Sequence, residues 1–172
     1  MHSKSYRFLT PLIMVLTWAN MEAQTSHNVP RLVVNVTIDQ LRTDYMEAFS
    51  SLFGAGGFNK VMRDGRSYMD AAYPFSHIDR ASAVACIMTG TVPYDNGIVG
   101  EHWMDRKTLR PMYCVDDATC EGWLTSEKYS PVALNVSTVT DELKMATGGR
   151  ALVYSIAPDA DAAILAAGHA AD

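Results

Sequence analysis

The sequence has few cysteines, no cluster of basic residues and, after its first residues, no apolar run long enough to cross a membrane. Its 14 Lys and Arg residues are outnumbered by 19 Asp and Glu residues, and the formal net charge is -5. This charge balance is not typical of nucleic-acid-binding proteins, so we expect no nucleic-acid partner. The hydrophobic content of 48% and the charged content of 19% indicate a globular protein. At 172 residues, the chain has the length of one domain.

The first residues form a segment of a different kind. Lys4 and Arg7 precede an apolar run over 8–18, which ends near Ala19-Asn20-Met21-Glu22-Ala23. This is the layout of a secretory signal peptide; the alternative, a membrane anchor, would need a longer apolar run. We expect residues 1–23 to be a signal peptide, which predicts an exported protein, periplasmic or extracellular, with no membrane span after cleavage.

The three cysteines allow at most one disulfide within the chain. Cys114 and Cys120 bracket a short polar stretch and could close a small loop, which an oxidising compartment would permit. Cys86 lies in an apolar helical pattern, and its thiol is expected to fill core space. The spacing of the three does not match a zinc finger.

Alternation of extended and helical patterns predicts the fold class. Strands are expected at 32–38, 67–73 and 151–156, with a fourth candidate at 162–165. Helices are expected at 43–53, 58–64, 80–89 and from 137 or 138 to 146. A hairpin or an extended excursion is expected within 103–115, and an irregular loop over 116–135. Asp79 is the expected N-cap of one helix, and Gly65 the expected left-handed C-cap of another. This order predicts an α/β fold, a mostly parallel sheet with helices on both faces.

Asp39 is the first candidate for chemistry. It directly follows the predicted strand 32–38, and the carboxyl ends of parallel strands are where open α/β sheets bind their ligands. Asp39 is therefore a candidate metal ligand or catalytic acid. The alternative is that its carboxylate only caps the helix that follows.

The residues around Asp39 also carry a family resemblance. The pattern Val-x-x-Asp-Gln-x-Arg-x-Asp-Tyr over 36–45 is followed in order by further short motifs: Gly56-Gly57-Phe58, Gly65, Tyr73-Pro74, Thr89-Gly90-Thr91-Val92-Pro93, Asn96-Gly97-Ile98-Val99-Gly100 and His102-Trp103. From about Arg31 to its end, the chain resembles the N-terminal part of the alkaline phosphatase superfamily. The likeness is to the bacterial periplasmic alkaline phosphatases and the nucleotide pyrophosphatase/phosphodiesterases.

The resemblance implies both a function and an incomplete domain. It implies metal-dependent hydrolysis of a phosphate monoester or diester, with a small-molecule phosphoester as substrate. Two zinc ions would clamp the phosphoryl group, with Asp39 as one ligand and the others beyond residue 172. Domains of this superfamily are more than twice as long, so residues 24–172 are expected to be the N-terminal part of one. The sequence does not give the oligomeric state.

Several positions depart from the pattern of the family. In the family the nucleophile lies nine residues before the Thr of Thr-Gly; counted back from Thr89, this is position 80, which holds Arg80. A guanidinium stays protonated and cannot attack phosphorus. Three positions that bind phosphate in the periplasmic enzymes through Asn, Lys and Arg hold acids here: Glu101, Asp159 and Asp161.

Two interpretations follow from these departures. In the first, catalysis persists with a shifted nucleophile: Ser82 leads, Ser76 and His77 are weaker, and the alternative role for Ser82 is hydrogen bonding at a helix end. In the second, the chain belongs to a catalytically inactive binding or scaffold protein, in which Arg80 and Glu101 either fill the former pocket, for example as an ion pair, or bind a different ligand. An unrelated flavodoxin-like domain without a metal at Asp39 is a third hypothesis.

Overall fold

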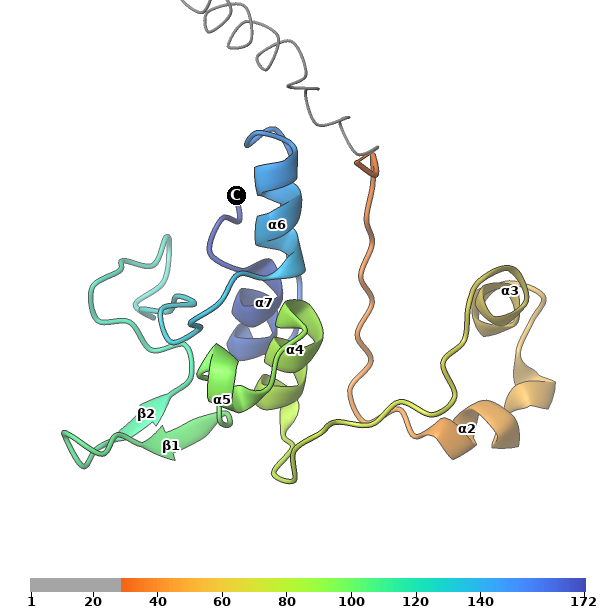
Figure 1. Cartoon of the computed structure of the whole chain (residues 1–172), viewed down its shortest axis with the longest axis horizontal. Helices are drawn as coiled ribbons and strands as arrows, with labels where there is room; N and C mark the ends of the chain where they lie inside the picture. The colour runs from red at the N-terminus through yellow and green to blue at the C-terminus, as the bar shows by residue number, and fades with distance from the viewer. Residues whose placement is uncertain (1–28) are drawn as a thin grey trace, which may run out of the picture. The chain divides into compact units, whose positions relative to one another are not determined.

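The structure is a computed structural model that describes residues 29–172. The expected signal peptide over 1–23 lies outside the described residues. The chain divides into two units, Met1–Val33 and Val34–Asp172, and every helix and strand described below belongs to the second (Figure 1). Within the described part, none of the helices has the length and apolarity needed to span a bilayer.

The first elements of the second unit are short helices. The helix α2 runs over Thr43–Ala48, and a 3-10 turn, η1, follows over Ser50–Leu52, so the helix predicted at 43–53 is interrupted at Phe49. The predicted helix at 58–64 is confirmed as α3, Gly57–Asp64. The prediction for Gly65 is wrong, because its φ of -106° is not left-handed. A Cβ at this position would lie 2.6 Å from the carbonyl oxygen of Val61, so the lack of space for a side chain, and not the backbone conformation, favours glycine.

Four further helices include the best-packed part of the unit. They are α4 (Arg80–Thr89), α5 (Pro93–Asn96), α6 (Val139–Ala146) and α7 (Ala160–Ala167). The helix α4 contacts α5, α6 and α7, and it runs beside α7 in Figure 1. The buried apolar residues gather around it: Ala81, Val84, Ala85, Met88, Ile98, Cys114, Val115, Leu134 and Leu165. This core fixes the positions of the starts of α4 and α7, where the candidate site lies.

Capping residues set the ends of α4 and α6. Asp79 is the N-cap of α4, as predicted, and its carboxylate accepts the backbone N–H of Ser82. Gly90 ends α4 with a left-handed φ of 69°, which glycine adopts without steric cost. Thr138 caps α6 in the same manner, and its hydroxyl accepts the backbone N–H of Asp141. The helices predicted at 80–89 and 138–146 are therefore confirmed.

The described strands form one antiparallel hairpin. The strand β1 runs over His102–Met104 and β2 over Pro111–Tyr113, and His102 pairs with Tyr113. This confirms the hairpin predicted within 103–115. The stretch that follows β2 is irregular, as predicted, apart from a single bridge between Asp116 and Tyr129.

The predicted parallel sheet is not formed among residues 29–172. The runs 32–38, 67–73 and 151–156 form no strand there, and 162–165 lies within α7. An extended run becomes a strand only when another extended segment pairs with its backbone groups. Among the described residues, no such segment pairs with these runs. Alanine-rich sequence instead favours a helix at 162–165. Alternate side chains of the run 151–156 are left exposed: Leu152, Tyr154 and Ile156.

The disulfide considered for the last two cysteines is also absent, since all three cysteines are free thiols. Cys114 is fully buried in the core, and the Cys120 thiol donates to the carbonyl oxygen of Asp117 at 3.2 Å. Burial raises the pKa of Cys114 to about 12, and the nearby carboxylates of Asp161, Asp79 and Glu101 act in the same direction.

Candidate functional site

Asp79 organises the start of α4 with both of its carboxylate oxygens. Oδ1 accepts the backbone N–H of Ser82 at 2.9 Å, and Oδ2 accepts the backbone N–H of Glu101 at 2.6 Å. Burial alone would raise the pKa of Asp79, but these hydrogen bonds to the charged form outweigh it and lower the pKa. A Cβ at Gly100 would lie 3.0 Å from Oδ2, so the glycine allows this close approach. Asp79 therefore joins the loop before β1 to the start of α4.

Arg80, the first residue of α4, is surrounded by carboxylates. Its Nε and Nη2 donate to the two carboxylate oxygens of Asp161, both at 3.1 Å. Its Nη1 lies 3.0 Å from Asp159 Oδ2, and its Nη2 lies 3.5 Å from Glu101 Oε2. The hydrogen bonds to Asp161 are the main cause that raises the pKa of Arg80. The four residues that sequence reasoning assigned to one pocket thus lie in contact, and we call Arg80, Glu101, Asp159 and Asp161 the Arg80 cluster.

The members of the Arg80 cluster differ in exposure. The side chain of Asp161 is fully buried at the start of α7, whereas those of Glu101 and Asp159 are 38% and 50% exposed. The backbone N–H of Asp161 donates to the hydroxyl of Tyr113 at 3.2 Å. Burial is the main cause that raises the pKa of Tyr113 to about 12. The cluster therefore has one pair whose carboxylate is fully buried, Arg80 with Asp161, and two carboxylates open to solvent.

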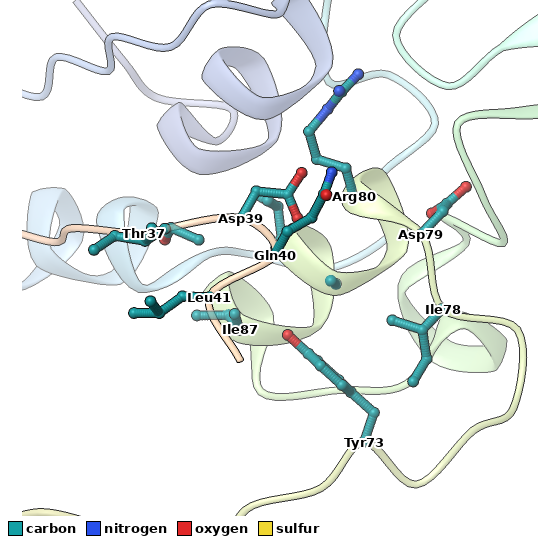
Figure 2. A pocket seen from close by; sticks show the side chains of 12 residues that line it. Thr37, Asp39, Gln40, Leu41, Tyr73, Ile78, Asp79, Arg80 and Ile87 are labelled. Atoms are coloured by element: carbon teal, nitrogen blue, oxygen red, sulfur yellow. The ribbon is translucent and has the colours of Figure 1, made fainter. Parts of the chain in front are cut away.

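Asp39 lies in a pocket that also reaches the start of α4. Its neighbours in the lining include Thr37, Gln40, Tyr73 and Arg80 (Figure 2). Figure 2 shows the side chains of Asp39 and Gln40 beside the first turn of α4, with the guanidinium of Arg80 extending away from them. Gln40 has a left-handed φ of 58°, which is uncommon for a residue other than glycine and costs about 1–2 kcal/mol. The tight turn at 39–40 thus holds an exposed carboxylate beside a helix start.

Ser82 has the contacts of a helix-end residue. It is fully buried, and its hydroxyl donates to Asp79 Oδ1 at 2.8 Å. The same hydroxyl accepts the backbone N–H of Asp79 at 3.0 Å, which completes a capping box. These contacts match the alternative role considered for Ser82, and its assignment as a substitute nucleophile stays a prediction. Ser76 and His77 are exposed in the loop before α4.

Asp39 alone does not make a zinc site. A catalytic zinc ion takes about three protein ligands, and residues 29–172 contain no group of three side chains able to hold a metal. An exposed carboxylate at a turn has the right chemistry for one ligand.

Sequence reasoning missed two residues of the site. Asp79 was recognised as an N-cap, but its contact with the backbone of Glu101 joins positions 22 residues apart and leaves no local signal. Tyr113 was not considered, although its hydroxyl contacts the start of α7 and its ring stacks on that of His102 at 4.8 Å. The short Ile98-Val99-Gly100 motif was the available signal for the first contact, since only a small residue fits at Gly100.

Comparison with known proteins decides the family. The family described as type I phosphodiesterase / nucleotide pyrophosphatase matches residues 33–165, most of the chain. The chain belongs to this family. The superfamily resemblance is thereby confirmed, and an unrelated flavodoxin-like domain is excluded.

Individual members of the alkaline phosphatase superfamily are similar over most of this chain. The alkaline phosphatase PhoV of Synechococcus elongatus is 40% identical over 146 residues, which are 83% of this chain and 26% of PhoV. The alkaline phosphatase PafA of Elizabethkingia meningoseptica is 35% identical over 171 residues, 94% of this chain and 31% of PafA. A crystal structure of PafA matches with a TM-score of 0.76 at 34% identity, over 83% of this chain and 29% of that chain.

These matches have two consequences. The described residues have the fold of the corresponding part of an alkaline phosphatase, and the relatives are phosphoester hydrolases. The chain spans between a quarter and a third of the length of these relatives. The activity of a whole protein of this family therefore comes to this chain only as a proposal.

Proposed function

We propose that the full-length protein is a metal-dependent phosphoester hydrolase that acts on a small-molecule phosphate monoester or diester. The observation that carries this proposal is the position of Asp39, an exposed carboxylate in the same pocket as the start of α4. Family membership supports it, because the matched region includes both segments. We further propose export to the periplasm or the extracellular space, with residues 1–23 as the signal peptide.

The contribution of this chain would be to bind and orient. Asp39 would supply one ligand to the zinc ions, which polarise phosphoryl oxygens when bound. The capping box of α4 would keep the helix start rigid beside that carboxylate. Position 80 holds a guanidinium, which cannot act as a nucleophile, and the Ser82 hydroxyl donates its hydrogen to Asp79.

Hydrolysis of chromogenic phosphate esters by the full-length protein tests this function. The zinc-loaded protein should release p-nitrophenol from a monoester or a diester, and Asp39→Ala should reduce both turnover and zinc content. Asp70→Ala, at another exposed position of the chain, is the matched control and should leave both unchanged. Equal zinc content and equal turnover in Asp39→Ala and the parent protein would remove Asp39 from the site.

A second candidate function is ligand binding without turnover. It is favoured by one observation: the residue at the position of the family nucleophile is held by a buried carboxylate and two others. In this case the protein would retain zinc and hydrolyse neither ester. Turnover in the parent protein that is lost in Asp39→Ala would reject this candidate, whereas bound zinc without turnover would reject the first.

A further inference from the structure

The side chain of Arg80 belongs to the type that binds oxyanions. A guanidinium donates two parallel hydrogen bonds to a phosphate or a carboxylate, and a helix start favours negative charge. Arg80 combines both features, because it is the first residue of the ten-residue helix α4. Only a quarter of its side chain is exposed, and carboxylates of the Arg80 cluster contact its terminal nitrogens.

Asp161 takes the place on Arg80 that an external oxyanion would need. Its two carboxylate oxygens receive Nε–H and Nη2–H in the same parallel geometry that a phosphate would use. The carboxylate is fully buried, and α7 packs against α4, so it is held at the guanidinium rather than exchanging with solvent. A group tethered in this way competes with free ligands at a high effective concentration.

Glu101 and Asp159 add a second barrier. Asp159 Oδ2 lies 3.0 Å from Nη1, the guanidinium nitrogen that Asp161 does not contact. Glu101 Oε2 lies 3.5 Å from Nη2. One guanidinium faces three carboxylates, so the cluster has an excess of two negative charges. An approaching phosphate dianion would be repelled by that excess, less strongly than in a buried site because both side chains are partly in water.

We propose that Asp161, together with Asp159 and Glu101, forms an autoinhibitory contact with Arg80 that keeps oxyanions away from the start of α4. The contact makes Arg80 a masked anion-binding residue. This inference goes beyond the proposed function and does not depend on turnover or on bound metal.

Titration of inorganic phosphate into the full chain tests the contact. A chelator removes divalent metals first, so that any binding reports on the protein alone, and calorimetry measures the dissociation constant at fixed ionic strength. The parent chain should show no saturable binding. The double variant Glu101→Gln/Asp159→Asn, which changes only partly exposed groups, should bind phosphate saturably, with a dissociation constant at least roughly tenfold below the highest phosphate concentration at which the parent shows no binding. Adding Asp161→Asn should tighten binding further.

Arg80→Met in the triple-variant background is the matched control. It keeps a long side chain but removes the guanidinium, so phosphate binding should be lost. Two results would overturn the proposal: variants that bind phosphate no better than the parent, or binding that persists after Arg80→Met. The double variant keeps the buried Arg80–Asp161 pair, so it tests the proposal even if the triple variant fails to fold.

Discussion

The three carboxylates in contact with Arg80 depend on it to different degrees, because they differ in burial. Asp161 is fully buried, and without the guanidinium its charge would lose the two hydrogen bonds that Arg80 donates to it. Asp159 and Glu101 can turn to water, so their ion pairs contribute little to stability. The energetics of the cluster therefore rest on the Arg80–Asp161 pair, whose bidentate geometry and burial make each partner costly to remove alone.

A double-mutant cycle measures this dependence. Arg80→Met should lower the free energy of unfolding by about 2–4 kcal/mol, because it leaves the Asp161 carboxylate buried without its partner. Adding Asp161→Asn removes that charge, so the double variant should be less destabilised than the two single losses added together. Urea denaturation of all four proteins gives the coupling energy.

Arg63→Met is the control for this cycle. Arg63 pairs with Asp64 on the exposed surface of α3, so its loss should cost at most about 1 kcal/mol. Additive losses at Arg80 and Asp161 would show that the pair is not coupled.

At the scale of elements, α4 and α6 were predicted from sequence to within a residue because their signals are local. Asp79 and Thr138 are capping residues directly before runs with helical pattern, and Gly90 ends α4. The segment 162–165 was predicted as a strand because its short apolar run fits both periods. Its alanine-rich composition was a local signal for a helix, and the packing of α7 against α4 adds a contribution that the local pattern does not reveal.

Substitution of Asp79 tests the start of α4. Asp79→Ala removes the N-cap and the contact with the backbone of Glu101, so it should lower the free energy of unfolding by about 1–2 kcal/mol at pH 7. The pKa of Asp79 is lowered in the folded state, so its charged form stabilises the fold above the unfolded value of about 3.9. That contribution is lost as the pH falls through the lowered pKa.

The effect of Asp79→Ala on stability should depend on pH in a defined direction. The stability difference between the parent and Asp79→Ala should be constant above about pH 5 and should shrink below about pH 4. Denaturation curves at a series of pH values measure it. A difference that grows on acidification would mean that burial, not hydrogen bonding, dominates at Asp79.

At the scale of the whole molecule, the sheet is what sequence reasoning could not place. Parallel pairing joins strands that are distant in sequence, so the pattern of a single run does not identify its partner. The runs 32–38 and 151–156 have the composition of buried strands, yet most of their large apolar side chains are exposed here. The Arg80 cluster was found from sequence by alignment, since family motifs fix positions 80, 101, 159 and 161 relative to one another. The spacing alone gave no reason to join them.

The redox state of the whole chain offers a simple check of the core. All three thiols should react with Ellman's reagent after unfolding without reductant, because the structure contains no disulfide among the described residues. In the folded chain at pH 8, Cys114 should be unreactive, since it is fully buried and its pKa is raised to about 12. A single reactive thiol in the unfolded chain would instead indicate one disulfide within the chain.

The buried pair also limits how such a sequence can arise one substitution at a time. An aspartate at position 161 without a cation beside it would place an uncompensated charge in the core, whereas an arginine at position 80 can extend toward solvent until a partner appears. We therefore expect that the arginine came first along the lineage, and that the aspartate then made the change hard to reverse. Reconstructed ancestral sequences with Arg80 and a neutral residue at position 161 should fold with little loss of stability, whereas those with Asp161 and a neutral residue at position 80 should be less stable by about 2–4 kcal/mol. Once both residues are present, replacement of Arg80 alone would then be disfavoured by the loss of stability.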